Sequence, residues 1–294
     1  MPGTDRSPAA AVPRFLYSHT DFHATALPST IRWQGSAVRL VPPGGHGYFE
    51  FMSDTGIVTE WIDIDVDGAV MSAYLAHPEA PGDYPGVIVG HEIYGQHESV
   101  LAAAERLASL GVTVLVPDLF YRTEPRAGLD WTPEGRERGL ELLRTLNRVG
   151  VVADIAACID ELKRRDATSV GMVGFSAGGH VAYYAATQLP LNVLAAFYPG
   201  WLTNTDIPLS TPEPTIELTE GITGRVILFF GGEDPLIDAA ARAELEKTLS
   251  DNGIEHELVV YEDAPHGFVY PGRDWYRPEA AEDAWSRLVG LLRE

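Results

Sequence analysis

The sequence is short of cysteine, of basic residues and of long apolar segments. Its 294 residues include one cysteine, Cys158, which excludes both a framework of disulfides within the chain and a cysteine-cluster metal site. Lysine and arginine number 21 against 42 aspartates and glutamates, for a formal net charge of −21. Such a surface repels nucleic acid and anionic membranes, so we expect neither as a partner. No apolar run approaches the roughly 20 residues that cross a bilayer.

The first residues, MPGTDRSPAAAVPRF, do not combine a basic start with an apolar segment, so we expect no signal peptide and a cytoplasmic protein. Cys158 lies in an apolar helical pattern in which it shares a face with Val151, Ile155 and Leu162. That pattern favours a buried structural thiol over a reactive one.

Composition divides the chain near residue 56. Residues 1–56 are rich in proline, glycine, serine, threonine and histidine and have no sustained periodicity. We interpret them as an N-terminal extension that either wraps the domain or meets a partner subunit, which leaves a homo-oligomer as one option. Residues 57–294 have the alternating pattern of a single catalytic domain.

The domain begins with a hairpin pattern that turns at Asp67-Gly68. Strand and helix patterns then alternate, and Thr132-Pro133 has the residue types of a helix start. This alternation predicts an α/β fold with a mostly parallel sheet covered by helices on both faces. The predicted strands are GVIVG (86–90), VTVLVPDLF (112–120), TSVGMVGFS (168–176), VLAAFY (193–198), RVILFF (225–230) and HELVVY (256–261).

A serine between two glycines follows one of these strands. The stretch Gly174-Phe175-Ser176-Ala177-Gly178 joins a buried strand to a helical pattern, which is the context of a nucleophile elbow. Small flanking residues let the chain turn sharply there, and the helix directs its positive end at the site. Glycine-flanked serines are also common in ordinary turns, so the five residues do not decide the function alone.

An acid and a histidine follow Ser176 in the order that this kind of fold requires. Asp234 comes directly after the strand at 225–230, and His266 comes five residues after the strand at 256–261. Taken singly, Asp234 fits a turn or a helix cap and His266 fits a loop. Their combined order and placement predict a catalytic triad with Ser176 as nucleophile.

An oxyanion hole needs the amide after the nucleophile and a second amide from an earlier loop. Ala177 supplies the first, and Ile93, in the loop His91-Glu92-Ile93-Tyr94-Gly95, is placed to supply the second. The same loop puts the carboxylate of Glu92 close to the nucleophile.

The motifs HEIYG, PDLFYR, GFSAGG, GGEDP and PHGF, in this order, resemble the dienelactone hydrolase family of α/β-hydrolases. The resemblance covers roughly residues 60–294 and leaves the extension unmatched. It implies hydrolysis of a cyclic enol-lactone that carries a carboxylate, no cofactor, and a nucleophile–His–Asp triad. It also implies that Glu92 is the family's loop glutamate and that Arg122 is an arginine that binds the substrate carboxylate.

Two positions depart from the family pattern. The family uses cysteine where this chain has Ser176, whose pKa is too high for activation by a nearby glutamate, so His266 must act directly as the base. Glu92 then serves either as a second acid/base group or as a structural acceptor. The family's other arginine falls at Tyr270, and this chain has Arg273 and Arg277 further along.

Other residues near the motifs leave alternatives open. Arg122 is either a substrate ligand or a salt-bridge partner of Asp118 or Glu124. Tyr94 either lines the pocket or packs in the core. The histidines of the HEIYG loop lack zinc-site spacing, so we expect no metal.

These patterns predict a serine hydrolase that cleaves small carboxylic esters or lactones and needs no cofactor. Two alternatives stay open: a peptidase or acyltransferase on the same fold, and a catalytically silent ligand-binding protein.

Overall fold

The structure, a computed structural model, describes residues 30–33, 36–39, 51–52 and 56–293. The chain divides into two units, Met1–Met52 and Ser53–Glu294. In the first unit, β1 (Thr30–Trp33), β2 (Ser36–Arg39) and β3 (Phe51–Met52) form an antiparallel sheet. Apart from Gly56, the rest of the predicted extension, 1–56, lies outside the described residues.

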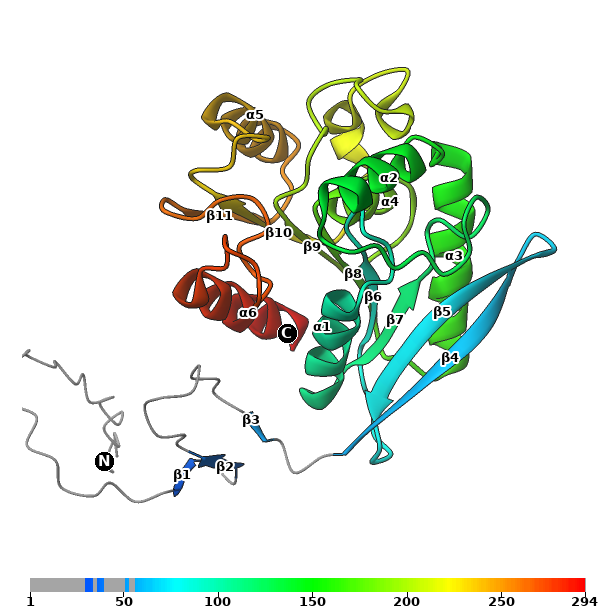
Figure 1. Ribbon diagram of the computed structural model, residues 1–294, viewed down its shortest axis with the longest axis vertical. Coiled ribbons are helices and arrows are strands. Elements are labelled where there is room, and N and C mark those ends of the chain that lie inside the picture. Colours follow the sequence, from blue (N-terminus) through cyan, green and yellow to red (C-terminus); the bar gives the residue numbers. More distant parts are fainter. Residues whose placement is uncertain (1–29, 34–35, 40–50, 53–55, 294) are drawn as a thin grey trace, which may run out of the picture. The chain divides into compact units, whose positions relative to one another are not determined.

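The second unit contains an eight-stranded sheet in the order β11-β10-β9-β8-β6-β7-β5-β4 (Figure 1). Neighbours from β11 to β7 pair in parallel, whereas β5 and β4 are antiparallel. The predicted mostly parallel sheet is thereby confirmed. The strands are β4 (Ile57–Val66), β5 (Ala69–Pro78), β6 (Gly86–Gly90), β7 (Thr113–Pro117), β8 (Val170–Phe175), β9 (Val193–Phe197), β10 (Arg225–Gly231) and β11 (His256–Tyr261).

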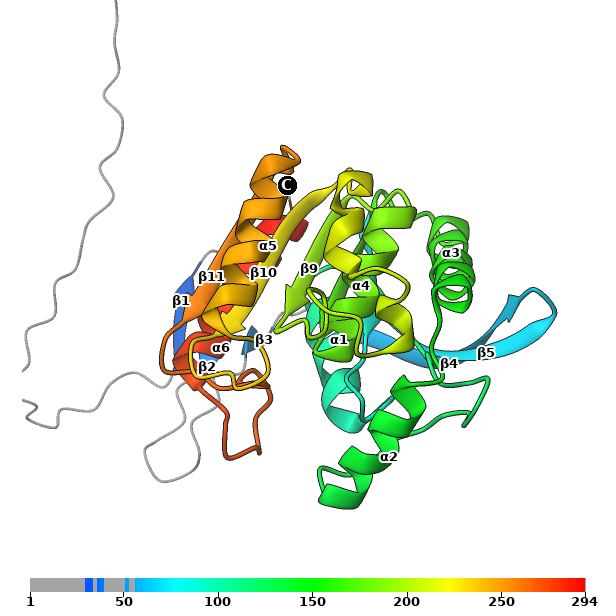
Figure 2. The same cartoon turned by 90° about the horizontal axis from the view of Figure 1, so that it is seen from above.

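Helices cover both faces of this sheet. Seen from above, α3, α4 and α5 lie along one face and α1 and α6 along the other (Figure 2). The central strands β6, β7 and β8 are buried along their whole length, which is why their sequences are continuously apolar. The helices are α1 (Glu98–Ser109), α2 (Pro133–Leu143), α3 (Arg148–Arg164), α4 (Ala177–Gln188), α5 (Ala239–Asp251) and α6 (Pro278–Leu292), with short 3-10 turns η1 (Pro208–Ser210) and η2 (Thr215–Gly221).

Local sequence signals set several of these boundaries. The hairpin turns at Asp67-Gly68, where both residues have positive φ, as predicted. The hydroxyl of Thr132 caps α2 by accepting from the amide of Gly135 at 3.0 Å, and Pro133 occupies the first turn. The predicted face of α3 is buried, and Cys158 lies within it with no exposed surface, where burial raises the pKa of its thiol.

A stack of three phenylalanines lies under the carboxyl ends of the central strands. Phe197 has its ring centroid 4.8 Å from that of Phe175 and 4.5 Å from that of Phe229. Trp285 of α6 packs against the same stack, with its ring centroid 6.1 Å from that of Phe175 and 6.0 Å from that of Phe197. Because Phe175 is the last residue before Ser176, this packing supports the position of the serine.

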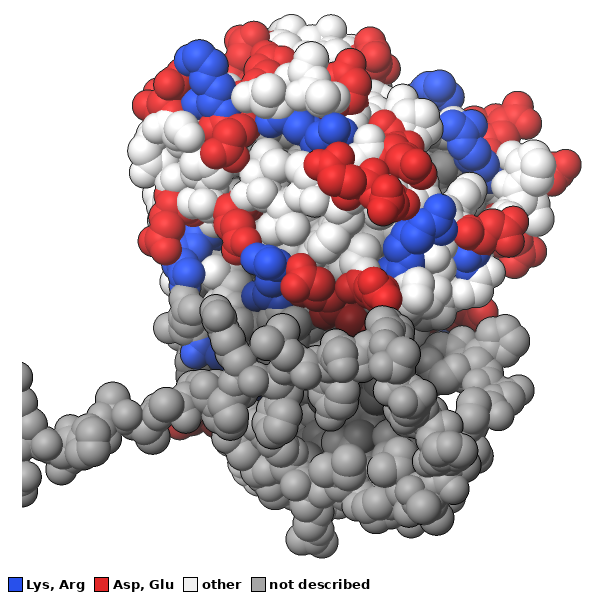
Figure 3. Space-filling view, turned by 90° about the vertical axis from the view of Figure 1, so that its left-hand side faces the viewer, with Lys and Arg blue, Asp and Glu red and all other residues white. Residues whose placement is uncertain are grey.

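Acidic residues are intermixed with arginines on the surface of this unit (Figure 3). Arg287 on α6, for example, contacts Asp283 at 2.7 Å and Glu257 of β11 at 2.5 Å. Exposed pairs of this kind contribute little to stability, about 1 kcal/mol or less each.

Candidate active site

Ser176 occupies a sharp turn between β8 and α4. Its φ of 52° and ψ of −114° are unusual for a residue with a side chain. The amide of Ser176 donates to the carbonyl of Phe197 at 2.9 Å, and its carbonyl accepts from the amide of His180 at 3.1 Å. These bonds hold the strained backbone between a strand and the first turn of a helix.

The flanking glycines allow this turn to form. A Cβ on Gly174 would lie 2.1 Å from the carbonyl oxygen of Gly178, and a Cβ on Gly178 would lie 2.2 Å from the carbonyl oxygen of Gly90. No larger residue fits at either position without a backbone shift. The close approach also places the end of β6, and the loop that follows it, directly against the serine turn.

The structure brings together the three residues that the chain order predicted. The Oγ of Ser176 lies 2.9 Å from Nε2 of His266, and Nδ1 of His266 lies 2.7 Å from Oδ2 of Asp234. The other oxygen of Asp234 accepts from the amide of Leu236 at 2.8 Å, which holds the carboxylate in place. Ser176 and Asp234 are buried, and His266 is partly exposed. This arrangement can move a proton from the serine hydroxyl to the imidazole.

The two predicted oxyanion-hole residues lie on elements that meet at this turn. Ala177 is the first residue of α4, and Ile93 follows the end of β6 in the loop 91–97. A Cβ on Gly178 would lie only 2.6 Å from the carbonyl oxygen of His91, so this loop and the start of α4 are in contact. His91 holds the loop, because its Nδ1 donates to the carbonyl of Glu92 at 2.7 Å and its Nε2 accepts from the amide of Leu119 at 3.2 Å.

Glu92 forms a buried ion pair with Arg273. The Nη2 of Arg273 lies 2.5 Å from Oε2 of Glu92, with 4% and 7% of the two side chains exposed. The guanidinium lies 4.0 Å from the ring centroid of Trp131 and 5.2 Å from that of Tyr94. Tyr94, which we considered as a pocket residue, is therefore packed against Arg273. The sequence contained Arg273 three positions beyond the expected arginine, but nothing in it indicated the partner.

Arg122 is bound to an acid that the sequence did not indicate. Its Nη1 and Nη2 donate to the two oxygens of Asp154 in α3, at 2.7 and 2.8 Å, and Tyr121 donates to the same carboxylate at 3.0 Å. The sequence left Asp118 and Glu124 open as salt-bridge partners of Arg122, and that alternative is wrong. Asp118 accepts from backbone amides, and Glu124 pairs with another arginine. Burial raises the pKa of Asp154 while Arg122 opposes that rise.

Tyr198 is a residue of this site that the sequence analysis missed. We predicted it as the end of a strand, but β9 ends at Phe197 and Tyr198 takes a φ of 40°. Its fully buried ring lies with its centroid 4.7 Å from that of His266. Burial, together with the nearby Glu92 and Tyr270, raises its pKa well above the ordinary tyrosine value.

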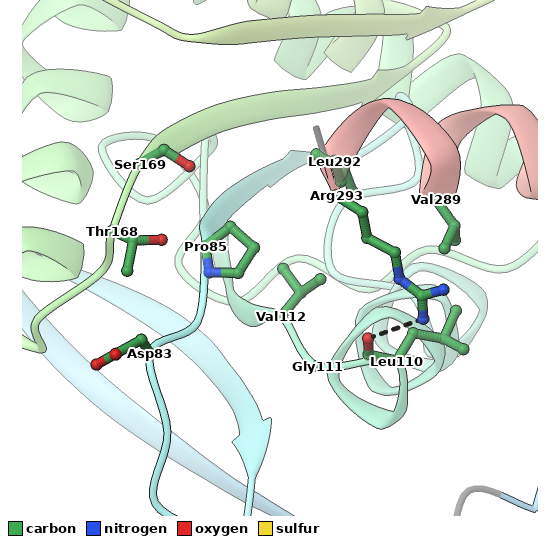
Figure 4. A pocket seen from close by; sticks show the side chains of 10 residues that line it. All are labelled: Asp83, Pro85, Leu110, Gly111, Val112, Thr168, Ser169, Val289, Leu292 and Arg293. Atoms are coloured by element: carbon green, nitrogen blue, oxygen red, sulfur yellow. Dashed lines mark hydrogen bonds between the residues drawn. The ribbon is translucent and has the colours of Figure 1, made fainter. Parts of the chain in front are cut away.

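Away from the triad, a pocket of about 390 Å³ opens at the opposite end of the sheet (Figure 4). Pro85, Val112 and Ser169, which precede β6, β7 and β8, line it together with Arg293, which donates to the carbonyl of Leu110 at 3.4 Å. The triad lies beyond the carboxyl ends of the strands, where ligands of open α/β sheets bind. This pocket lies at the amino ends of the strands instead.

Two features are absent from the residues that the structure describes. Within that part of the chain, no three histidine, cysteine or acidic side chains lie together as a metal would require. Across the same residues, no helix combines the length and the apolar character needed to cross a membrane.

Comparisons with known proteins include a family match and similar curated proteins. The model of the "Dienelactone hydrolase family" matches residues 71–294. A Synechocystis protein named "Putative carboxymethylenebutenolidase" is 32% identical over 244 residues, covering 81% of this chain and 97% of that protein. A Bradyrhizobium protein named "Probable 2-oxo-3-(5-oxofuran-2-ylidene)propanoate lactonase" is 30% identical over 245 residues, covering 82% and 96%.

A solved structure shares the fold described above. The "Putative Dienelactone Hydrolase" of Klebsiella pneumoniae superposes with a TM-score of 0.73 at 25% identity, over 81% of this chain and 99% of that one. The fold is thus that of the α/β-hydrolases, as the motif order predicted. With a family match that spans most of its length, this chain belongs to the dienelactone hydrolase family.

Proposed function

We propose that the protein is a serine hydrolase that cleaves small carboxylic esters or lactones through an acyl-enzyme. The observation that carries the proposal is the continuous hydrogen-bonded series from Asp234 through His266 to Ser176. It occurs at a strained turn with the hydroxyl next to the start of a helix. A serine hydroxyl needs such a base to become a nucleophile at neutral pH.

In the proposed reaction, Oγ of Ser176 attacks the carbonyl carbon while its proton moves to Nε2 of His266. The Nδ1–H of His266 keeps its bond to Asp234, which stabilises the imidazolium. The amides of Ala177 and Ile93 bind the oxyanion. The alcohol oxygen leaves with the proton from Nε2, and for a lactone that oxygen stays tethered to the acyl group. Water then attacks the acyl-enzyme and gives a proton to Nε2 of His266, which passes it to Oγ of Ser176 as the acid product leaves.

Serine in place of the family's cysteine changes what activates the nucleophile. A thiol can be converted to a thiolate before substrate attack, whereas a serine hydroxyl must lose its proton as it attacks. The 2.9 Å contact with His266 supplies a base for that step without a contribution from Glu92. The carboxylate of Glu92 is instead bound to Arg273. Of the two roles left open for Glu92, the structural one therefore has the better support.

The names of the relatives suggest lactones as one substrate group. One relative is named as a carboxymethylenebutenolidase and another as a lactonase. Substrate binding by Arg122 needs its own test, because both Nη atoms of its guanidinium already donate to Asp154. Comparing neutral esters with carboxylate-bearing lactones in wild type and Arg122→Ala tests this point. A selective rise of KM for the carboxylate substrates would support substrate binding by Arg122.

The nucleophile itself can be tested by covalent labelling. A fluorophosphonate probe is expected to label wild type at Ser176, and Ser176→Ala is expected to lose both the label and ester turnover. Ser169→Ala, in a loop at the other end of the sheet, serves as the matched control and is expected to keep both. Unlabelled wild type, or a folded Ser176→Ala with full turnover, would contradict the proposal. Labelling also separates an enzyme from a silent binding protein.

A further inference from the structure

The buried carboxylate of Glu92 lies one residue from the proposed oxyanion donor Ile93. Its charge acts on Tyr198, whose ring packs against His266, so it also opposes the negative charge that develops on the substrate oxygen beside that histidine. In a site with little water such a repulsion is stronger than it would be in bulk solvent. An oxyanion hole built next to a lone carboxylate would therefore be a poor one.

Arg273 supplies the compensating charge from a distant part of the sequence. The ion pair joins the loop 91–97 after β6 to the loop after β11, across 181 positions of the chain. The second loop carries His266, and a Cβ on the adjacent Gly267 would lie 2.9 Å from Nη1 of Arg273. The guanidinium therefore lies against the turn that holds the catalytic histidine.

Within the part of the chain that the structure describes, the ion pair leaves one polar atom of each partner without a hydrogen bond. Among the described residues, Oε1 of Glu92 and Nε of Arg273 are buried and have no hydrogen-bond partner. The aromatic rings around Arg273 contact its faces, with Trp131 at 4.0 Å and Tyr270 at 5.2 Å from Cζ. Burial lowers the pKa of Arg273, but Glu92 and Tyr198 raise it, and the net direction is upward. Removing either partner leaves an uncompensated buried charge.

We propose that Arg273 is a positioning residue that neutralises Glu92 and holds the loop of Ile93 against the loop of His266. This inference rests on the serine mechanism proposed above. In this role Arg273 contributes to the turnover of neutral substrates as much as to that of charged ones. The oxyanion then forms beside an ion pair with no net charge and not beside a lone carboxylate.

A double-variant cycle on a neutral ester tests this role. The full chain would be compared as wild type, Arg273→Met, Glu92→Gln and the double variant, with kcat and KM for p-nitrophenyl acetate and the melting temperature of each. We expect Arg273→Met to lower kcat about 100-fold, similar to the loss of one oxyanion donor, with KM changed less than about 3-fold. Glu92→Gln is expected to lose less, because it leaves a cation that does not oppose the oxyanion.

The double variant is the decisive one. Since it removes the lone carboxylate, we expect it to recover at least about 10-fold in kcat over Arg273→Met. A role limited to packing would show no such recovery, because the double variant has lost both sets of contacts. Arg273→Lys keeps the charge and is expected to retain more activity than Arg273→Met, which keeps the test usable where Arg273→Met does not fold.

Arg277→Met is the matched control in the same loop. Arg277 donates to backbone carbonyls, including that of Asp263 at 3.1 Å, and pairs with no carboxylate in the bonds that the structure describes. Its substitution is expected to change kcat by less than about 3-fold, as for a surface change. A loss as large as that of Arg273→Met would overturn the proposal, because loosening the loop would then suffice.

Other outcomes distinguish this inference from the function itself. Wild type labelled at Ser176, combined with Arg273→Met that turns over p-nitrophenyl acetate at the wild-type rate, overturns the inference and leaves the proposed function intact. The same follows if Arg273→Met raises KM only for a carboxylate-bearing lactone, which would make Arg273 a substrate ligand. Failure of wild type to label at Ser176 overturns the proposed function and, with it, the inference.

Discussion

The imidazole of His266 packs against the ring of Tyr198, with centroids 4.7 Å apart and planes inclined at 58°. Because His266 becomes an imidazolium during the proposed reaction, this contact places an aromatic ring beside a transient cation. Contacts of that kind contribute about 0.5–2 kcal/mol, depending on desolvation. Tyr198 is fully buried and follows β9, so its ring is held in place by the sheet.

We therefore expect Tyr198→Leu to lower kcat about 10-fold through loss of this ring contact. Tyr198→Phe keeps the ring and removes only a hydroxyl near Glu92, so kcat should stay within about 3-fold of wild type. Steady-state kinetics on a neutral ester would measure both. Equal losses in the two variants would contradict a role for the ring.

Asp234 is expected to act through orientation and charge. In Asp234→Asn the amide oxygen keeps the bond from the amide of Leu236, so the side-chain NH2 faces Nδ1 of His266. This favours the wrong tautomer of the imidazole and removes the charge that stabilises the imidazolium, so we expect kcat to fall about 10³- to 10⁴-fold. KM should change little, because Asp234 is buried behind the histidine. Asp238→Asn, at the cap of α5, is the control and should leave kcat unchanged. Normal turnover by Asp234→Asn would remove it from the triad.

Gly178 is expected to tolerate no side chain. Because its Cβ would meet the carbonyl of Gly90 at 2.2 Å, Gly178→Ala should separate α4 from β6 and destabilise the domain by about 3 kcal/mol. Gly200→Ala is the matched control, since its Cβ would have no neighbour within 4 Å. Urea unfolding of both variants measures the difference. A Gly178→Ala variant as stable as Gly200→Ala would show that the contact can relax freely.

Acid should destabilise the protein through its buried histidines. Burial lowers the pKa of His91 to about 4 and that of His180 to about 4, from an ordinary value of 6.5. The pKa of each histidine is lower in the folded protein than in the unfolded chain. The free energy of unfolding is therefore highest above about pH 6.5 and falls as the pH drops toward 4, where the unfolded chain binds protons that the folded protein does not. Each group corresponds to roughly 3 to 4 kcal/mol over that whole range, since one pKa unit is about 1.4 kcal/mol.

Urea midpoints at pH 7.5 and pH 5 measure this loss. In His91→Gln, the side-chain amide can donate to the carbonyl of Glu92 and accept from the amide of Leu119, as the neutral imidazole does. We expect this variant to lose less stability between the two pH values than wild type does. An identical loss would show that His91 does not titrate in this range.

What the sequence by itself determined was local. Continuous apolar runs identified the strands that are buried on both faces, and cap residues such as Thr132 marked helix starts, because both depend on near neighbours in the chain. The glycines around Ser176 and the order of Ser176, Asp234 and His266 followed from the same kind of reasoning. In a parallel sheet, residues after different strands meet at one edge.

Only the tertiary structure decided which distant side chains pair. Glu92 and Arg273 are 181 positions apart, and Arg122 reaches Asp154, an acid within the largely buried α3. Long arginine side chains can span many geometries, so spacing in the sequence does not select their partners. Tyr198 looked like one more strand residue, because a positive φ at a residue other than glycine is imposed by the surrounding packing, and so is its ring contact with His266.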